Sequence, residues 1–513
     1  MFYVLAESMG GIIAEMMNLY FIAVLVFSVL AGLLLGALPG FSATMSIAIL
    51  LPFTFTMPPA AGITMLMGVY AASLCGSAIP AILIQTPGTA ASAATVADGY
   101  QLTLQGQGLK ALGVAMIASA VGGVLSGLAL LFISPPLASF SLRFSAPEYF
   151  LIACLGLCII ASLAGDSMPK GLLAGALGLA IGVVGLDAVT GAPRMTFGSI
   201  NLESGINFVP AMIGLFALPQ VFSEAEKILR KRREKVATEK ATEKAVIKAE
   251  GKMIPTAAEF IMLIPTMIRS SIIGIVVGII PGPGADIGSW ISYNEGKRFA
   301  KKPELYGKGS LEGITASETA NNAVAGGTLI PLFTLGIPGS AAAAVLMGGL
   351  MIHGLVPGHA LFTTHATVTY SAIFGFLIAK LLMGIVGLGI APFVVKITHI
   401  PPAVLYPIVV VFSLVGSFAM RNNIFDVYTM FAFGVLGHFM KKADFPTAAT
   451  VLGMILGSMA EIGFRTSLVM SRGNMISFFF SRPISVVLIV LLVICVGLPI
   501  ISGVKKKKQT TDT

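Results

Sequence analysis

Long uncharged apolar blocks recur along the chain and predict membrane-spanning helices. Residues 19–38, 111–142, 381–395 and 486–504 contain no charged side chain. About 20 apolar residues cross the hydrocarbon core of a bilayer, and by this criterion we count about ten to twelve candidate segments, several of them short or interrupted by Pro and Gly. The pattern predicts an all-α polytopic membrane protein.

Composition supports this fold class. Hydrophobic residues make up 56% of the 513 residues and charged residues only 11%, whereas soluble domains carry about 25% charged residues. A water-soluble fold of this length needs more charge on its surface. The four cysteines lie in apolar segments, which is typical of buried small side chains rather than of disulfides or a metal site.

The net charge of +9 is concentrated in a few segments, and this predicts orientation. Basic residues gather in 224–252, 297–308, 441–442 and 505–508. The positive-inside rule places these segments in the cytoplasm. Glutamates are interleaved in 224–252, so we expect a solvated, partly helical linker there. Nucleic-acid binding is a poor alternative, because no basic–aromatic platform accompanies the charge.

Matching motifs on either side of the basic linker indicate two related halves. The pattern Gly-x-x-x-Gly-x-x-Pro-Gly occurs at 32–40 and again at 274–282. A second pair of motifs, at 76–90 and 327–341, each contains Pro-Gly followed by Thr or Ser and then Ala. We predict a first transmembrane repeat at 1–222, a basic cytoplasmic linker at 223–253, a second repeat at 254–504 and a cytoplasmic tail at 505–513.

The halves are expected to be inverted relative to each other. The second half inserts the basic loop 297–308 between its motifs, whereas the matching region of the first half, 53–62, has no charge. Equivalent loops with unequal Lys and Arg content belong on opposite sides of the membrane. Inverted repeats with broken helices are a common plan of secondary transporters.

The Pro-Gly motifs predict helix breaks that can bind an anion. Pro removes a helical hydrogen bond and Gly permits an irregular turn, and open backbone at membrane depth is tolerated only inside protein or along a cavity. Amides at half-helix N-termini attract negative charge. The predicted substrate-binding residues of these breaks are Pro39, Gly40, Ser42, Pro87, Gly88, Thr89, Pro281, Gly282, Pro338, Gly339 and Ser340. Ordinary helix packing and loop ends are the alternative explanation.

A polar run at 318–322 precedes the second hairpin motif. A carboxylate and two amides in an apolar context are costly unless they are paired or functional. We expect Asn321 and Asn322 to donate to a carboxylate substrate and Glu318 to help bind a coupling cation. A helix cap or an interhelical hydrogen bond stays open as the alternative. Secondary candidates, expected mostly in loops or interfaces, are Asp98, Asp187, Asp286 and Glu461.

No catalytic or metal signature accompanies these motifs in the sequence. The five histidines have no ligand spacing, and HExxH, GxSxG and the P-loop motif are absent. We therefore expect neither an enzyme nor an ATP-driven pump. Because no Lys or Arg falls within the Pro-Gly motifs, a multiply charged anion would favour a co-transported cation, Na⁺ or H⁺, and no other cofactor.

Several stretches resemble the large membrane subunit of the tripartite tricarboxylate transporters, TctA. They are residues 36–44 (GALPGFSAT), 76–95 (GSAIPAILIQTPGTAASAAT), 278–284 (GIIPGPG) and 318–339 (ETANNAVAGGTLIPLFTLGIPG). The resemblance covers nearly the whole chain and implies an importer of the bacterial inner membrane for a small carboxylate. It also implies a periplasmic solute-binding protein, a small four-helix membrane subunit, an ion gradient as the driving force, and an elevator-like motion of a transport domain against a scaffold.

Two alternatives remain at this point. The chain can be a stand-alone ion-coupled antiporter or an anion channel, neither of which needs a binding protein. Uptake in vesicles without a periplasmic partner would favour them.

Overall fold

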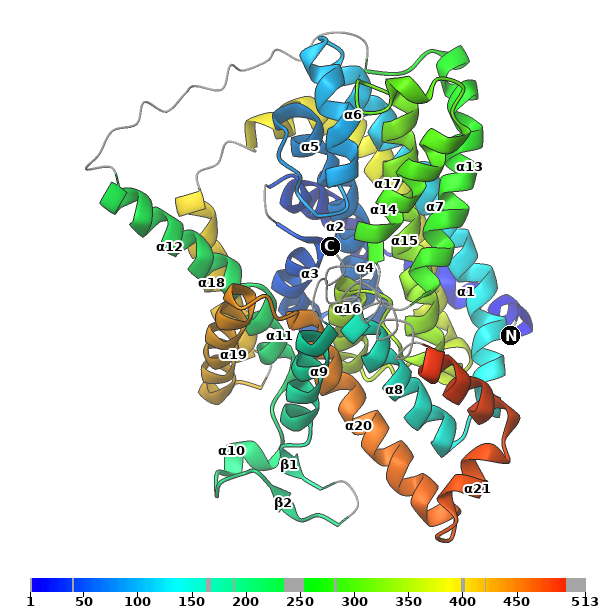
Figure 1. The fold of residues 1–513 in the computed structure, drawn as a ribbon, viewed down its shortest axis with the longest axis vertical. Helices are drawn as coiled ribbons and strands as arrows, with labels where there is room; N and C mark the ends of the chain where they lie inside the picture. The colour runs from blue at the N-terminus through cyan, green and yellow to red at the C-terminus, as the bar shows by residue number, and fades with distance from the viewer. Residues whose placement is uncertain are drawn as a thin grey trace, which may run out of the picture. The chain divides into compact units, whose positions relative to one another are not determined.

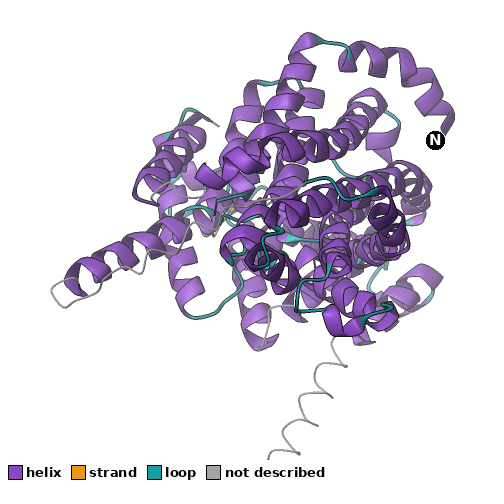
Figure 2. Cartoon of the chain, turned by 90° about the horizontal axis from the view of Figure 1, so that it is seen from above, coloured by secondary structure: helices purple, strands orange, loops and turns teal. Residues whose placement is uncertain are grey.

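Helices make up almost all of the described structure. The computed structural model describes residues 2–38, 41–162, 168–187, 190–234, 253–280, 284–397, 402–419 and 421–494. Figure 2 shows these ranges as helices joined by short loops. Within these ranges the strands are β1 (Gly185–Leu186) and β2 (Pro193–Arg194), an antiparallel pair that joins Gly185 to Arg194 and Leu186 to Pro193.

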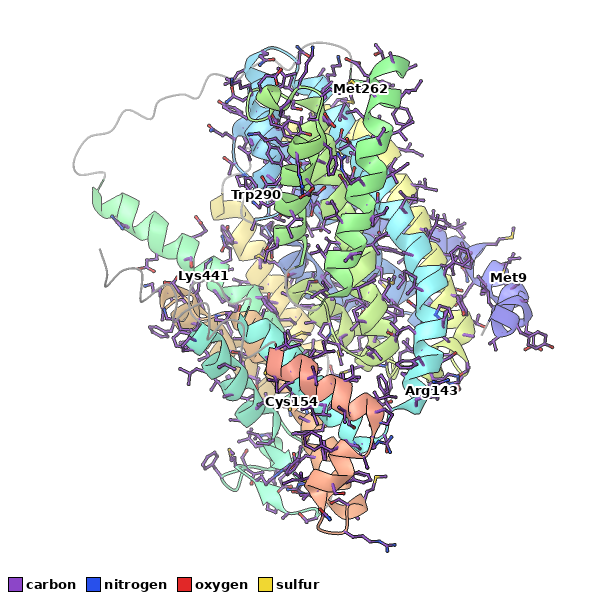
Figure 3. The ribbon with its side chains drawn as sticks, turned by 45° about the vertical axis from the view of Figure 1, so that its right-hand side comes forward. Met9, Arg143, Cys154, Met262, Trp290 and Lys441 are labelled. Carbon is purple, nitrogen blue, oxygen red and sulfur yellow. The ribbon has the colours of Figure 1, made fainter. Side chains whose placement is uncertain are left out.

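The predicted class, an all-α polytopic membrane protein, is confirmed. Seven helices in the described part of the chain are long and apolar enough to cross a membrane, and six further apolar helices have 10–17 residues. Large apolar side chains project outward, such as Met9, 37% exposed, and Met262, 58% exposed (Figure 3). Outward apolar side chains suit helices that are surrounded by lipid. The seven spans are Leu19–Gly36, Pro59–Ile84, Gly108–Arg143, Phe208–Glu226, Ala257–Ile279, Ala366–Ile390 and Thr447–Met470.

The chain forms two compact units, and each combines segments from both predicted halves. Unit 1 contains Met1–Ser139 and Val221–Gly416, and unit 2 contains Phe140–Gln220 and Ser417–Thr513. The predicted repeats, 1–222 and 254–504, therefore do not coincide with the compact units. All four predicted helix breaks fall in unit 1.

The first half of unit 1 contains seven α-helices and one 3-10 helix. They are α1 (Phe2–Met16), α2 (Leu19–Gly36), α3 (Ala43–Leu50), η1 (Leu51–Thr56), α4 (Pro59–Gly76), α5 (Ala78–Ile84), α6 (Ala93–Leu104) and α7 (Gly108–Phe140), which ends at the unit boundary. Asn18 begins α2, because its side chain accepts a hydrogen bond from the Tyr20 amide at 2.9 Å.

The second half of unit 1 follows a similar order. It contains α13 (Ala257–Ile279), α14 (Gly284–Phe299), η3 (Pro303–Leu305), α15 (Leu311–Leu335), α16 (Ala341–Ile352), η4 (His359–Phe362), α17 (Ala366–Ile397) and α18 (Pro402–Ala419). In Figure 1, α13, α14 and α15 lie side by side in green. The capping box of Thr256 and Glu259 begins α13. Before it, α12 (Leu218–Glu234) extends into the basic linker, of which residues 235–252 lie outside the described ranges.

Glycine contacts are similar in the two halves of unit 1. A Cβ atom on Gly32 of α2 would lie 2.9 Å from the Val69 carbonyl oxygen of α4. A Cβ atom on Gly274 of α13 would lie 2.6 Å from the Ala320 carbonyl oxygen of α15. The partners, 69 and 320, differ by 251, which is the offset of the second motif pair. The first pair of motifs thus forms close helix packing, the role that small-xxx-small patterns have in membranes.

The equivalent helices α4 and α15 run in opposite directions where they meet. The Tyr70 hydroxyl lies 3.3 Å from the Thr328 hydroxyl, and the Asn321 amide lies 3.4 Å from the Leu74 carbonyl oxygen. Moving forward along α4, from 70 to 74, the contact moves backward along α15, from 328 to 321. This is the arrangement that inverted repeats require.

Unit 2 is held together by helix packing and by ion pairs. It contains η2 (Ser141–Arg143), α8 (Ala146–Ser162), α9 (Met168–Gly182), α10 (Ile200–Glu203), α11 (Phe208–Phe216), α19 (Ile424–Lys442), α20 (Thr447–Met470) and α21 (Met475–Phe480). The buried Glu148 accepts hydrogen bonds from Arg482 and Ser485, both at 2.6 Å. Removal of the Arg482 side chain would leave Glu148 as a buried charge without a counter-ion.

Candidate functional site

Each predicted Pro-Gly break is followed by the start of a new helix. α2 ends at Gly36 and α3 begins at Ala43; α13 ends at Ile279 and α14 begins at Gly284. Likewise α6 begins after the 87–88 break and α16 after the 338–339 break. Pro39, Gly40, Pro281 and Gly282 themselves lie outside the described residues. Four helix N-termini, with their free amides, therefore follow the four breaks.

Two of the predicted hydroxyl residues act as helix caps. The Ser42 hydroxyl accepts a hydrogen bond from the Met45 amide at 3.1 Å and begins α3. The Ser340 hydroxyl accepts from the Ala343 amide at 3.2 Å and begins α16. Each oxygen thereby accepts one hydrogen bond from its own helix, and the hydroxyl hydrogen remains available as a donor.

The two Pro-Gly hairpin turns pack in equivalent ways. A Cβ atom on Gly88 would lie 2.6 Å from the Gly36 carbonyl oxygen, and one on Gly339 would lie 2.6 Å from the Gly278 carbonyl oxygen. Each turn thus presses against the end of the GxxxG helix of its own half. Only glycine permits this approach, because the neighbouring atom is backbone.

Thr89 and Ser340 occupy matching sequence positions but have different neighbours. The Thr89 hydroxyl lies 3.2 Å from that of Ser77 and 3.4 Å from that of Ser92. The Ser340 hydroxyl lies 3.3 Å from the hydroxyl of Tyr70, a residue of the other half. Hydroxyl groups therefore line both turns. At Ser340 they include the phenol of Tyr70, which the sequence motifs do not contain.

The two turns converge on the first turn of α14. A Cβ atom on Gly284 would lie 3.5 Å from Cβ of Ser340. Two residues further along α14, the carboxyl group of Asp286 lies close to the backbone of Ala91. Because Ala91 follows the first hairpin turn and Ser340 closes the second, residues 87–91 and 338–340 meet at the same helix N-terminus.

The polar run on α15 is fully buried, and Glu318 is satisfied by hydroxyls. Thr95 donates to one carboxylate oxygen of Glu318 at 2.5 Å, and Ser119 donates to the other at 3.1 Å. Glu318 has 0% of its surface exposed. The donors come from α6 and α7, so the carboxylate joins the second half of the chain to the helices that follow the first hairpin.

Asn321 and Asn322 each have one polar atom without a partner. The Asn321 side-chain oxygen and the Asn322 side-chain nitrogen are buried and make no hydrogen bond. The Asn321 side-chain nitrogen donates to the Leu74 carbonyl oxygen at 3.4 Å. The Asn322 side-chain oxygen accepts from the Lys380 ammonium at 3.1 Å. Buried polar atoms without partners are costly. An interhelical hydrogen bond therefore accounts for one polar atom of each side-chain amide and leaves the other atom without a structural partner.

Tyr70 and Lys380 are not among the site residues predicted from the sequence. Both are fully buried in apolar helices, α4 and α17. A lysine within an otherwise apolar span was a usable signal, because an ionisable residue in a membrane helix marks a functional site by default. Nothing in the local pattern around Tyr70 points to its contact with Ser340, 270 residues away.

The secondary carboxylates divide between the site and structural roles. Asp286 belongs to the convergence described above. Asp98 is buried and accepts hydrogen bonds from the Gly307 and Ser310 amides at 2.8 Å and from the Tyr293 hydroxyl at 2.8 Å. It therefore holds the loop that precedes α15.

Asp187 and Glu461 form ion pairs with arginines of unit 2. Arg194 donates to Glu461 at 2.5 Å and Arg465 donates to Asp187 at 3.0 Å. The hydrogen bonds to Glu461 raise the pKa of the Arg194 guanidinium above its ordinary value. These two carboxylates thus have structural partners, as expected for interface residues.

Comparison with known proteins identifies the family. The model of the tripartite tricarboxylate transporter TctA family matches residues 22–452. An uncharacterized 52.8 kDa protein in the TAR-I ttuC′ 3′ region of Agrobacterium vitis is 35% identical over 481 residues, covering 94% of this chain and 93% of that protein. An uncharacterized protein in the TAR-II ttuC′ 3′ region of the same organism is 33% identical over 236 residues, 46% of this chain and 97% of that protein.

No solved structure matches the chain. The match to the family model extends over most of the sequence and contains all four helix breaks, the polar run on α15 and Lys380. The chain belongs to the tripartite tricarboxylate transporter TctA family.

Proposed function

We propose that this protein is the large permease subunit of a binding-protein-dependent importer that moves a small dicarboxylate or tricarboxylate, such as citrate, across a bacterial inner membrane. Membership of the TctA family supports a transporter rather than an enzyme. In this proposal a periplasmic solute-binding protein delivers the substrate, a small four-helix subunit accompanies the permease, and an ion gradient drives uptake.

One observation supports an anionic substrate most directly. Two equivalent hairpin turns meet at the N-terminus of α14, and hydroxyl groups of Thr89, Ser340 and Tyr70 lie in or beside those turns. Helix N-termini stabilise a nearby anion by about 0.3–2 kcal/mol each. Several of them together can hold a carboxylate without a direct ion pair, while hydroxyl donors orient it.

The two compact units suggest a division of labour. Unit 1 contains the four helix breaks and the buried polar run. We assign it the part of the substrate-carrying transport domain and assign unit 2 the part of the scaffold. This is the arrangement that an elevator-like transporter needs.

Uptake by the reconstituted complex tests the proposal. Proteoliposomes would contain the permease and the small subunit, with the binding protein and radiolabelled citrate outside, alongside a panel of other dicarboxylates and tricarboxylates. We expect accumulation only with the binding protein and an ion gradient. Equal uptake without the binding protein would favour the alternative, a stand-alone antiporter or an anion channel.

Substitution of the turn hydroxyls tests the site itself. We expect Thr89→Val and Ser340→Ala each to lower uptake about tenfold, since one hydrogen bond to a charged group contributes about 1.5 kcal/mol. Thr334→Val and Ser271→Ala are matched controls, because these hydroxyls bond within their own helices, to the carbonyl oxygens of Ile330 and Met267. Wild-type uptake by the Thr89→Val, Ser340→Ala double variant would remove both hydroxyls from the site.

A further inference from the structure

Lys380 is a buried lysine within a membrane-spanning helix. It lies in the Ala366–Ile390 span of α17 and has 0% of its surface exposed. Its ammonium donates to the side-chain oxygen of Asn322 at 3.1 Å and to the backbone oxygen of the same residue at 3.4 Å. The ring of Phe376 lies 5.1 Å from the ammonium. These contacts solvate the cation but do not neutralise it.

The fold makes room for this side chain. A Cβ atom on Gly123 of α7 would collide with the aliphatic stem of Lys380. The stem therefore lies directly against a helix backbone, and its position is determined by packing. A lysine that faced lipid would instead extend its charged end toward the membrane surface.

No carboxylate within the described ranges pairs directly with Lys380. The nearest acid along α15 is Glu318, one helical turn before Asn322. The thiol of Cys75 on α4 lies near both Glu318 and Lys380. α7, which also packs here, offers Gly123 and the Ser119 hydroxyl. Among the titratable groups described in unit 1, Cys75 thus lies near Lys380, and Glu318 is linked to Lys380 through Asn322, one helical turn along α15.

The charge balance of this pair depends on one proton. An isolated charge is very unfavourable in a dry, low-dielectric interior. With Glu318 ionised and Lys380 protonated, the pair is neutral overall. One added proton on Glu318 leaves a net charge of +1, and a nearby bound anion stabilises that state. The hydroxyls of Thr95 and Ser119 can serve either form of Glu318, because a hydroxyl can donate or accept.

We propose that Glu318 and Lys380 form a proton-coupling pair, in which Glu318 takes up one proton when the anion binds and Lys380 keeps its own proton as a permanent counter-cation. The inference rests on the proposed function and names H⁺ as the coupling ion. In the uptake step, a hydronium ion on the outer side gives a proton to a Glu318 oxygen and becomes water, and an O–H bond forms. In the release step, the O–H bond breaks, the proton returns to water on the inner side, and the anion leaves.

Substitutions at the two positions separate coupling from binding. Glu318→Gln has the shape of the protonated acid and cannot release a proton. Lys380→Met removes the counter-cation and keeps the length of the stem. We expect Glu318→Gln to exchange citrate across the membrane within twofold of wild type. We expect both variants to accumulate at least tenfold less citrate than wild type under an inward proton gradient in Na⁺-free buffer. Lys110→Met is the control, because Lys110 pairs with Glu259 at the helix ends.

The experiment uses the complete complex in proteoliposomes, and size-exclusion profiles and melting curves of each variant verify folding. Proton-driven accumulation by Glu318→Gln at the wild-type level would overturn the inference. Loss of exchange by folded Glu318→Gln would also overturn it, because the residue would then be needed for binding. Wild-type accumulation that requires Na⁺ and ignores the proton gradient would overturn the inference but not the proposed function. A wild type that neither exchanges nor accumulates any carboxylate refutes the proposed function and the inference with it.

Discussion

Replacing Asp98 removes the acceptor that holds the loop between α14 and α15. One oxygen of this buried carboxylate accepts hydrogen bonds from the amides of Gly307 at 2.8 Å, Gly309 at 3.0 Å and Ser310 at 2.8 Å. The other accepts the Tyr293 hydroxyl at 2.8 Å. The four donors satisfy both oxygens of the carboxylate, so we assign Asp98 a structural role.

The size of the effect follows from these four bonds. A hydrogen bond to a charged group contributes about 1.5–3 kcal/mol. The sum is an upper bound, because Gly307 is exposed and its amide can turn to water. We expect Asp98→Ala to destabilise the closed loop by about 4 kcal/mol and Asp98→Asn by about 1–2 kcal/mol, since asparagine keeps one acceptor oxygen but no charge.

Hydrogen exchange measures this loop directly. Amides exchange when the loop opens locally, and each 1.4 kcal/mol changes the open population about tenfold. The amides of residues 307–310 should exchange about a thousandfold faster in Asp98→Ala and about tenfold faster in Asp98→Asn. Fluorescence of Trp290, the single tryptophan of the chain, gives a second signal, because its ring lies 5.9 Å from that of Tyr293.

Glu304→Gln is the matched control for this prediction. It removes one negative charge from the same loop at an exposed position, so exchange at residues 307–310 should not change. If Asp98→Ala exchanged at the wild-type rate, the loop would be held by other contacts and the hydrogen-bond argument would be refuted.

Two further predictions concern packing and a buried ion pair. Gly88→Ala should lower the stability of the folded protein by about 1–3 kcal/mol, because the added methyl group meets the backbone of Gly36. Gly10 has open space around it, so Gly10→Ala should not lower the melting temperature. Equal melting temperatures of the two variants would contradict the close approach at Gly88. Glu148→Ala should cost about 2–3 kcal/mol, less than for a fully buried pair because Arg482 is 31% exposed. Chemical unfolding measures it, and a variant as stable as wild type would show that the ion pair contributes nothing.

The sequence by itself determined the membrane class, and it predicted the pairing of the halves and the positions of the breaks. These features are local. An apolar run of sufficient length must be a helix that crosses a bilayer, since only internal hydrogen bonding satisfies its backbone there. Pro-Gly favours an interruption of such a helix, because Pro removes a hydrogen bond and Gly permits an irregular turn. The interruptions predicted at Pro87-Gly88 and Pro338-Gly339 are present in the structure.

Only the tertiary structure decided which polar groups meet. The partner of Glu318 is Thr95, 223 residues away, the partner of Ser340 is Tyr70, and the partner of Asn322 is Lys380. These contacts depend on which helix backbones approach closely, and glycines such as Gly123 determine that through three-dimensional packing rather than through spacing along the chain. Helical periodicity specifies which face of a helix a residue occupies but not which helix packs against that face.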